Sequence, residues 1–240
     1  MAGNGGPPGK LHSDPVSYAD GGHRYESVLC EPGSASLLPA VIILHGLFGL
    51  QDMDSGFAAR LAGEGYVTLV HGWQTEDPDP SDREIVSGVG AAAAWLSRRE
   101  SVDADRLALI GICRGGTLAL LSAASMDLFR AVVSLYGQAR YPCHDQRRPV
   151  SPIDCLESIN APVLLVHGEA DRTFPVEESR ALARRLRALG KRHATGYFAG
   201  AGHGFLLEGH RNHDPVAAQQ AWPVLLRFLD GEARRPRHCR

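Results

Sequence analysis

Short runs of apolar residues alternate with longer segments of helical period from residue 40 onward. Continuous apolar runs are typical of strands buried on both faces of a parallel sheet, and the segments between them are typical of helices that cover it. The predicted strands are AVIILH (40–45), YVTLVH (66–71), RLALIG (106–111), AVVSLY (131–136), PVLLVHG (162–168) and HATGYFA (193–199). The pattern therefore predicts an α/β protein with a doubly wound sheet.

Capping signals mark the ends of the predicted helices. Ser81 and Glu84 have the spacing of a capping box, in which each side chain bonds the backbone N–H of the other residue. Gly190 stands just after a helical segment, where a left-handed residue is favoured. The helices expected on these grounds span residues 81–99 and 177–189, and a last helix is expected over residues 216–229.

Two short β-prone runs precede the parallel strands, within residues 16–32. Asp20, Gly21 and Gly22 stand between these runs, and this sequence is typical of a tight hairpin turn. We therefore expect an antiparallel hairpin at one edge of the sheet. With its two strands added, the sequence predicts an eight-stranded, mostly parallel sheet with helices on both faces.

The two ends of the chain differ in composition from the middle. Residues 1–14 are rich in glycine, proline and polar residues, which predicts a flexible tail, and residues 231–240 are expected to be a frayed, basic C-terminus. No linker or internal repeat divides residues 15–230, so we expect a single domain there. The segment 138–160 is too short for a large lid, which predicts an open site and a small substrate.

Composition and charge narrow the class of protein. The 240 residues are 44% hydrophobic and 22% charged, a balance that excludes a collagen, a coiled coil and a disordered chain. Lys plus Arg number 25 against 27 for Asp plus Glu, so no positive field exists to hold a nucleic acid. No long apolar run and no signal-peptide pattern occurs, so we expect no membrane association and a cytoplasmic location.

Five cysteines are scattered along the chain without a CxxC pair: Cys30, Cys113, Cys143, Cys155 and Cys239. An odd number without close spacing fits neither a disulfide framework nor a zinc site. We therefore expect free thiols in a reducing compartment and no bound metal.

One of these cysteines stands in a motif that carries chemistry. The strand 106–111 runs into Gly111-Ile112-Cys113-Arg114-Gly115-Gly116, and a helical stretch follows. This is the G-x-C-x-G form of a nucleophile elbow, in which glycines allow strand and helix to approach closely. The start of a helix also favours the thiolate, which is the reactive form of cysteine. On the motif alone, a small buried cysteine in a glycine turn is an equal alternative.

Two further residues follow later strands of the same predicted sheet. Asp171 comes just past the strand 162–168, and His203 lies in a glycine-rich loop past the strand 193–199. Nucleophile, acid and histidine occur in this order in α/β-hydrolases, and all three loops lie at the carboxyl edge of the sheet. Alone, Asp171 would be a helix cap and His203 a solvated loop residue, but together with Cys113 they predict a catalytic triad.

Backbone amides near the elbow are candidates for an oxyanion hole. The segment HGLFG (45–49) follows the first parallel strand, where α/β-hydrolases place one donor, and the second donor is the residue after the nucleophile. We expect the N–H groups of Leu47 and Arg114 to serve, with His45 as a buried residue behind them. Aromatic residues near strand ends are candidates for a substrate pocket, with core packing as the alternative: Phe48, Trp73, Tyr136 and Phe174.

The segments PAVIILHGLFGL, GICRGG, HGEADRTFP and AGHGF together resemble the dienelactone hydrolases, or carboxymethylenebutenolidases, within the α/β-hydrolases. The resemblance covers residues 16–230, and cysteine at the elbow separates it from a resemblance to serine esterases. It implies hydrolysis of an enol lactone, with Cys113 as nucleophile, His203 as general base and acid, and Asp171 orienting the imidazole. It implies no cofactor.

Two positions depart from the pattern of that family. The characterised enzymes have a glutamate that helps to control thiol ionisation where this chain has Gly46, and an arginine for the substrate carboxylate where it has Leu207. Both departures argue against an anionic dienelactone as substrate. Other arginines could supply a replacement charge or be plain surface residues: Arg140, Arg147, Arg148 and Arg172.

The chemistry of cysteine narrows the reaction further. A thiolate nucleophile works best when the carbonyl carries a good leaving group, which favours enol lactones, thioesters and activated aryl esters. The sequence therefore predicts a hydrolase that cleaves an enol lactone or another activated ester through an acyl-thioester, acting on a small molecule as a monomer or small homo-oligomer. Two alternatives stay open: a broad carboxylesterase or thioesterase for neutral substrates, and a non-hydrolytic binding or thiol-sensing protein on the same fold.

Overall fold

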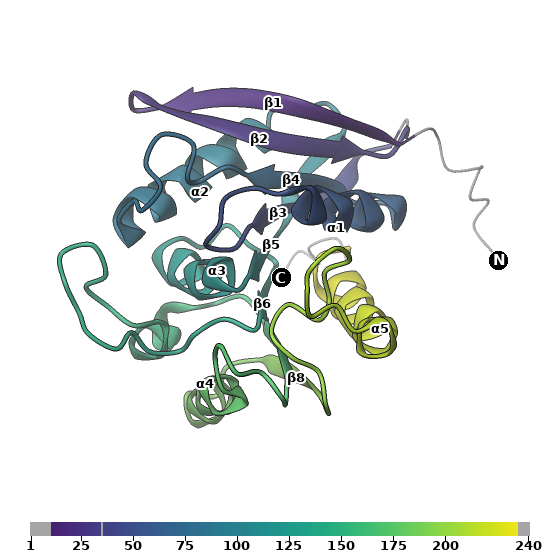
Figure 1. Ribbon diagram of the computed structural model, residues 1–240. Coiled ribbons are helices and arrows are strands. Elements are labelled where there is room, and N and C mark those ends of the chain that lie inside the picture. Colours follow the sequence, from purple (N-terminus) through teal and green to yellow (C-terminus); the bar gives the residue numbers. More distant parts are fainter. Residues whose placement is uncertain (1–10, 35, 235–240) are drawn as a thin grey trace.

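The computed structural model describes residues 11–34 and 36–234, and eight strands in this part of the chain form one sheet (Figure 1). The strands are β1 (His12–Asp20), β2 (His23–Glu31), β3 (Leu38–Leu44), β4 (Val67–His71), β5 (Val102–Ile112), β6 (Ala131–Leu135), β7 (Val163–Gly168) and β8 (His193–Phe198). Their order across the sheet is β1-β2-β4-β3-β5-β6-β7-β8. All neighbouring pairs from β4 to β8 are parallel, which confirms the predicted mostly parallel sheet.

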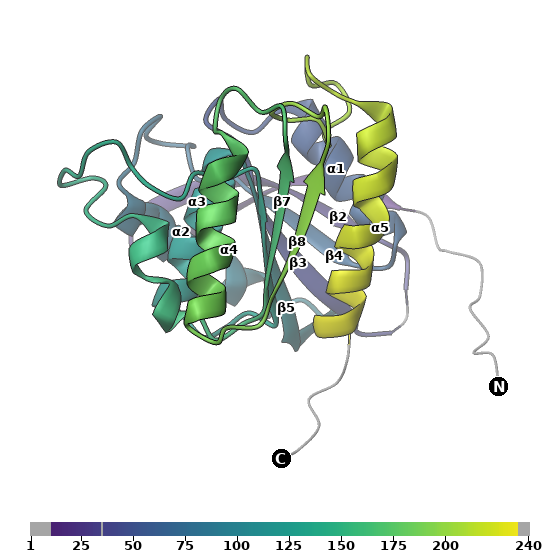
Figure 2. The same ribbon diagram turned by 90° about the horizontal axis from the view of Figure 1, so that it is seen from below.

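Helices cover both faces of the sheet (Figure 2). The helices are α1 (Asp52–Gly63), α2 (Asp82–Leu96), α3 (Arg114–Ser125), α4 (Val176–Ala188) and α5 (Pro215–Glu232). α2, α3 and α4 pack on one face and α1 and α5 on the other, so alternate residues of a central strand enter different cores. In β3, for example, Ile42 and Leu44 face the first group of helices, and Val41 and Ile43 face the second. The predicted α/β fold is therefore confirmed.

The hairpin predicted before the parallel strands is present at one edge of the sheet. β1 and β2 are antiparallel, and β2 in turn is antiparallel to β4. Gly21 and Gly22 form the turn and have φ of +55° and +90°, values that a tight hairpin turn requires and that glycine adopts without strain.

The fold extends beyond both predicted ends of the domain. The flexible tail predicted over residues 1–14 is wrong for His12–Asp14, because these residues pair with the end of β2. The frayed C-terminus predicted over residues 231–240 is wrong for its first two residues, which belong to α5. Residues 1–10 and 235–240 lie outside the described residues.

Helix starts follow local capping chemistry. The Ser81 hydroxyl accepts the N–H of Glu84 at 3.3 Å and the Glu84 carboxylate accepts the N–H of Ser81 at 2.8 Å, which confirms the predicted capping box of α2. α1 has no counterpart among the predicted helices. Gly56 and Gly63 lie within it, and glycine weakens the sequence signal of a helix.

Loops rather than a further helical layer surround the carboxyl edge of the sheet in the described part of the chain. The connection from β6 to β7 contains only two single-turn helices, η1 (Pro152–Asp154) and η2 (Leu156–Ser158). None of the helices in residues 11–34 and 36–234 is both long and apolar enough to cross a membrane. Location and oligomeric state stay predictions.

Candidate active site

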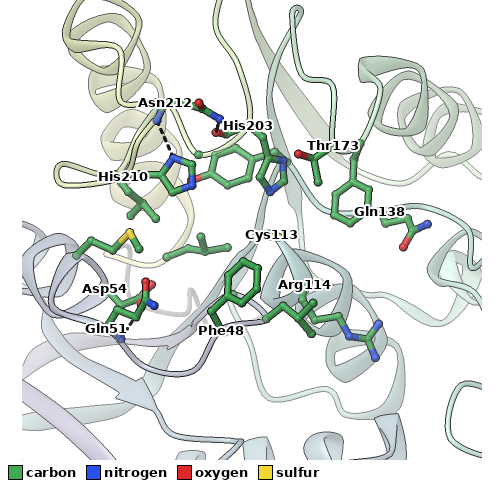
Figure 3. A pocket seen from close by; sticks show the side chains of 18 of the residues that line it. Phe48, Gln51, Asp54, Cys113, Arg114, Gln138, Thr173, His203, His210 and Asn212 are labelled. Atoms are coloured by element: carbon green, nitrogen blue, oxygen red, sulfur yellow. Dashed lines mark hydrogen bonds between the residues drawn. The ribbon is translucent and has the colours of Figure 1, made fainter. Parts of the chain in front are cut away.

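Cys113 stands at a sharp turn between β5 and α3. Its φ of +58° and ψ of -117° lie in a region that is strained for a residue with a Cβ. The turn needs glycine on both sides: a Cβ on Gly111 would lie 1.9 Å from the carbonyl oxygen of Gly115, and a Cβ on Gly115 would lie 2.0 Å from that of Leu44. The segment thus has the strand–turn–helix geometry expected for the motif, and Cys113 lines a cavity (Figure 3).

Asp171 is held by hydrogen bonds in the loop after β7. Its Oδ1 accepts the N–H groups of Thr173 at 2.8 Å and Phe174 at 2.9 Å, and its Oδ2 lies 2.7 Å from Nδ1 of His203. Burial would raise the pKa of this carboxyl group, but hydrogen bonds from His167, His203 and the Phe174 backbone hold the pKa well below its usual range. Asp171 is therefore ionised, and it fixes a proton on Nδ1 of His203.

His203 directs its other ring nitrogen toward Cys113 (Figure 3). This Nε2 is buried and makes no hydrogen bond with the described residues. Burial would lower the pKa of the imidazole, but the hydrogen bond to Asp171 and the neighbouring Cys113 raise the pKa from 6.5 to about 9. Tyr136 and Phe174 pack edge-on against the ring, with centroids 5.0 Å and 5.4 Å away. The structure brings the three residues of the predicted triad together.

His167, near the end of β7, is a site residue that the sequence analysis missed. Its Nε2 lies 2.8 Å from the carbonyl oxygen of Phe174 and 3.3 Å from Oδ2 of Asp171. Because a carbonyl oxygen only accepts, Nε2 carries a proton and supports the loop and the carboxylate together. The available signal was a histidine at the end of a buried strand that leads into the Asp171 loop.

The loop after β3 lies directly against Cys113. A Cβ on Gly46 would be 3.6 Å from the Cβ of Cys113, an ordinary packing distance. The Gln74 side chain holds this loop from two sides, since it accepts the N–H of Gly49 at 3.0 Å and donates to the carbonyl of Leu47 at 3.0 Å. Gln74, which the sequence analysis also missed, therefore fixes the peptide units around Leu47.

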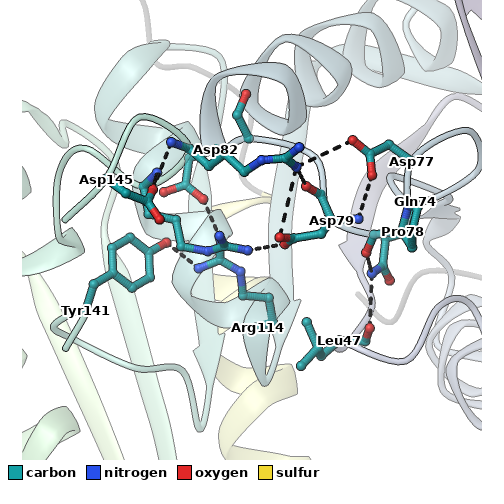
Figure 4. Close-up of polar contacts among 12 residues, drawn as sticks. Leu47, Gln74, Asp77, Pro78, Asp79, Asp82, Arg114, Tyr141 and Asp145 are labelled. Atoms are coloured by element: carbon teal, nitrogen blue, oxygen red, sulfur yellow. Dashed lines mark hydrogen bonds and ion pairs between the residues drawn. The ribbon is translucent and has the colours of Figure 1, made fainter. Parts of the chain in front are cut away.

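Arg114 has two separate roles in the structure. It is the first residue of α3, so its N–H is one of the donors without a partner inside the helix. Its buried guanidinium donates to the Asp82 carboxylate and the Tyr141 hydroxyl, and it lies 4.9 Å from the centroid of the Tyr141 ring (Figure 4). The charge of this side chain is therefore already neutralised.

The arginines considered as replacements for the family's carboxylate ligand occupy different places. Arg148 lines the cavity, but its guanidinium is paired with Asp79. The other three, Arg140, Arg147 and Arg172, are not among the residues that line this cavity. Arg211 also lines the cavity, at its exposed rim.

A cavity of about 670 Å³ opens in front of Cys113 and His203. Three of the four aromatic candidates line it: Phe48, Tyr136 and Phe174. Trp73 does not, because it is buried behind the loop after β3, where it stacks on His45 with ring centroids 4.9 Å apart and donates to the His45 carbonyl at 3.3 Å. For Trp73, the pocket prediction is wrong and core packing is correct. Other wall residues that the sequence did not indicate include Gln51, Met53, Asp54, His210 and Asn212.

The mostly parallel sheet, the strained elbow after β5 and the histidine–carboxylate pair at the same sheet edge define an α/β-hydrolase. Within the described residues no group of three or more His, Cys, Asp or Glu side chains could hold a metal ion. Residues 25–232 match the model of the dienelactone hydrolase family, and the chain belongs to that family. The resemblance seen in the sequence is thereby confirmed.

Relatives cover nearly the whole chain. A protein of Bradyrhizobium named "Probable 2-oxo-3-(5-oxofuran-2-ylidene)propanoate lactonase" is 31% identical over 231 residues, which are 90% of this chain and 93% of that protein. A protein of Escherichia coli (strain K12) named "Putative carboxymethylenebutenolidase" is 26% identical over 209 residues, 80% of this chain and 76% of that protein. The crystal structure of a "Putative Dienelactone Hydrolase" from Klebsiella pneumoniae has a TM-score of 0.84 at 24% identity and covers 92% of this chain and 98% of its own, which shows the shared fold.

Proposed function

We propose that the protein hydrolyses an enol lactone or another activated ester, with Cys113 as nucleophile, His203 as general base and acid, and Asp171 as the residue that orients the imidazole. One observation carries the proposal. Cys113 stands in a strained elbow and lines a cavity together with His203. Nδ1 of His203 lies 2.7 Å from the ionised, buried carboxylate of Asp171. This is the arrangement that a nucleophile with an oriented base requires.

The raised pKa of His203 supports a protonated imidazole beside the nucleophile. With a pKa of about 9, the imidazole holds two protons at neutral pH, one on Nδ1 toward Asp171 and one on Nε2 beside Cys113. This imidazolium and the positive end of the first turn of α3 are the two groups that can stabilise the thiolate as it attacks. Gly46 has no side chain to contribute, so these two groups activate the thiol.

The thiolate of Cys113 attacks the carbonyl carbon of the substrate, and the electron pair of the C=O bond moves to oxygen. That oxyanion accepts hydrogen bonds from the N–H groups of Leu47 and Arg114. Collapse of the intermediate breaks the bond to the alcohol or enol oxygen, which takes the Nε2 proton of His203. An acyl-thioester remains on Cys113, and in a lactone the leaving group stays attached to the acyl part.

Water resolves the acyl-thioester in the second half of the reaction. His203 is now neutral and takes a proton from water as the oxygen of the water attacks the thioester carbonyl. The second tetrahedral intermediate uses the same two amides. Its collapse breaks the C–S bond, releases the carboxylic acid and restores the thiolate of Cys113 beside protonated His203.

Two features of the wall support a second candidate, a carboxylesterase or thioesterase for neutral substrates. Leu207 is buried in the wall, and the guanidinium groups of Arg114 and Arg148 are already paired. The residues and steps of catalysis would be the same. The lactone form is supported by the name of the Bradyrhizobium relative, which is that of a lactonase.

The proposal is tested by the release of 4-nitrophenolate from 4-nitrophenyl acetate in the first milliseconds after mixing. We expect a burst of about one equivalent per chain, followed by slower turnover, because the thioester forms faster than water resolves it. Cys113→Ala is expected to lose both phases. The matched control Cys143→Ala, which removes an exposed thiol, should keep both.

Full turnover by Cys113→Ala would overturn the proposal. A thiol sensor on this fold would give a different pattern, with peroxide oxidation of Cys113 and no acyl adduct after the ester pulse.

A further inference from the structure

A buried carboxyl group lies in the cavity wall away from the triad. Asp54, in the first turn of α1, is only 3% exposed and lines the cavity. Its Oδ2 accepts the N–H of Gln51 at 2.9 Å. No hydrogen bond to Oδ1 is found among the described residues, and Oδ1 is not one of their fully buried unpartnered atoms. In Figure 3 Asp54 and Gln51 lie on one side of Cys113, and Arg114 lies on the other. The cavity therefore has a polar acceptor at its α1 end.

No cation within the described residues pairs with Asp54. The guanidinium groups of Arg114 and Arg148 in the wall are bound to Asp82 and Asp79. Arg211 lies at the exposed rim, where water and salt screen its charge. The α1 end of the cavity thus carries a negative charge that no ion pair with a side chain of the described residues neutralises.

His210 lines the same cavity and does not compensate this charge. Burial lowers the pKa of its imidazole, and the nearby His203 and Arg211 lower it further, so the ring is neutral. Its Nδ1 accepts the N–H of Asn212 at 3.1 Å, which leaves its proton on Nε2. Burial raises the pKa of Asp54 to about 6, with the Gln51 hydrogen bond opposing the rise, so the carboxyl group is ionised above that pH.

We propose that Asp54 is a specificity-determining residue that accepts a hydrogen bond from a hydroxyl group of the substrate and rejects substrates with a carboxylate at this end of the cavity. The inference rests on the proposed function, because it concerns an ester that is cleaved at Cys113. A substrate that fills the cavity removes water from this carboxylate, and a hydroxyl group supplies a replacement donor without adding charge. Consider a substrate carboxylate ~6 Å from Asp54 in a site of effective dielectric constant about 20. Repulsion between the two charges would lower the affinity for that substrate roughly a hundredfold, before screening by salt.

The test uses three 4-nitrophenyl esters with acyl chains of equal length: hexanoate, 6-hydroxyhexanoate and hydrogen adipate. For the wild-type protein we expect kcat/KM to fall from the hydroxyl ester to the apolar ester to the carboxylate ester. Asp54→Asn keeps an acceptor for the Gln51 N–H but removes the charge. It should raise kcat/KM for the adipate ester tenfold or more and change the hexanoate ester less than twofold.

Asp52→Asn is the matched control, because Asp52 is an exposed acid in the same first turn of α1. It removes the same charge from the start of the helix and should leave all three esters unchanged. Asp54→Ser, which also removes the charge, is a second variant in case Asp54→Asn folds poorly. Equal effects of Asp54→Asn on all three esters, or no effect, would overturn the inference. So would a wild-type preference for the adipate ester that Arg211→Ala removes.

A second measurement separates failure of this inference from failure of the proposed function. Iodoacetamide and iodoacetate are similar in size but differ in charge, and both alkylate a thiol without any ester hydrolysis. The rates of alkylation at Cys113 are read from the masses of its peptide. Iodoacetate should gain relative to iodoacetamide in Asp54→Asn, by less than the adipate ester gains because its carboxylate lies close to the sulfur, and should not gain in Asp52→Asn. An unchanged ratio in both variants would contradict the role of Asp54 even in a protein that hydrolyses no ester.

Discussion

Asp171→Asn replaces the charge that sets the ionisation of His203 by a neutral group of equal size. Oδ1 of Asp171 accepts two backbone N–H groups, from Thr173 and Phe174, so the amide oxygen of Asn takes that position. The NH₂ group of Asn then faces His203 and His167, both of which donate to the native carboxylate. The variant therefore loses the acceptor for Nδ1–H and favours the tautomer with its proton on Nε2 alone.

The pKa of His203 gives the magnitude. Its rise from 6.5 to about 9 corresponds to about 3 kcal/mol at 1.36 kcal/mol per pKa unit, shared between Asp171 and Cys113. Losing most of that interaction, together with the wrong tautomer, should lower kcat/KM on the order of a hundredfold to ten-thousandfold. Acylation needs protonated His203, which exists below its pKa, so kcat/KM of the wild type should fall as the pH rises through about 9. In Asp171→Asn this alkaline limb should move toward the ordinary histidine pKa of 6.5.

The assay is the burst rate with 4-nitrophenyl acetate from pH 5 to pH 10, run with far-ultraviolet circular dichroism to confirm that the variant is folded. Asp127→Asn, which changes an exposed acid beyond the other end of α3, is the control and should match the wild type. A folded Asp171→Asn protein with an unchanged alkaline limb and a rate within threefold of the wild type would refute the account of His203.

Two further predictions concern stability. Gly115→Ala places a Cβ 2.0 Å from the carbonyl oxygen of Leu44 and should lower the free energy of unfolding by more than about 3 kcal/mol. Gly90→Ala is the control, because its new Cβ meets its nearest neighbouring atom at 3.9 Å. It should raise the free energy of unfolding by up to about 1 kcal/mol. Urea titrations in which both variants behave alike would contradict the close approach at the elbow. Burial lowers the pKa of His71 to about 3, against 6.5 in the unfolded chain. As the pH falls, the unfolded state therefore binds a proton before the folded state does. The free energy of unfolding should drop by up to about 1.4 kcal/mol per pH unit between those two pKa values. His71→Gln, which keeps an acceptor for the Tyr18 hydroxyl, should reduce this loss of stability between pH 7 and pH 5, as measured by urea titrations. An equal loss of stability in the variant and the wild type would contradict this reasoning.

The parts of the fold that the sequence predicted well are those where one physical requirement dominates. A strand buried on both faces must be apolar throughout, so β3, β4 and β7 are visible as continuous runs. The elbow is visible because both flanking glycines are forced by backbone contacts. Asp171 and His203 follow from the order of the strands, since parallel strands bring their carboxyl ends to one edge.

The parts that the sequence did not predict depend on tertiary contacts. β1 begins at His12 although its first residues are polar, because pairing with β2 rather than burial holds an edge strand. Trp73 follows β4 as a pocket residue would, but its ring turns behind the loop after β3 to stack on His45. Asp54 belongs to a helix with a weak sequence pattern, and its place in the wall depends on where that helix packs.

The central claim is that the acyl group of the substrate passes through the sulfur of Cys113. It is tested most directly by quenching the protein in acid a few milliseconds after mixing with 4-nitrophenyl butanoate and mapping the acyl group by peptide mass. We expect the added mass on the peptide that contains Cys113, sensitive to hydroxylamine as a thioester is, with no acyl group found in Cys113→Ala. An acyl group on another residue, or turnover without any acylated peptide, would contradict the account.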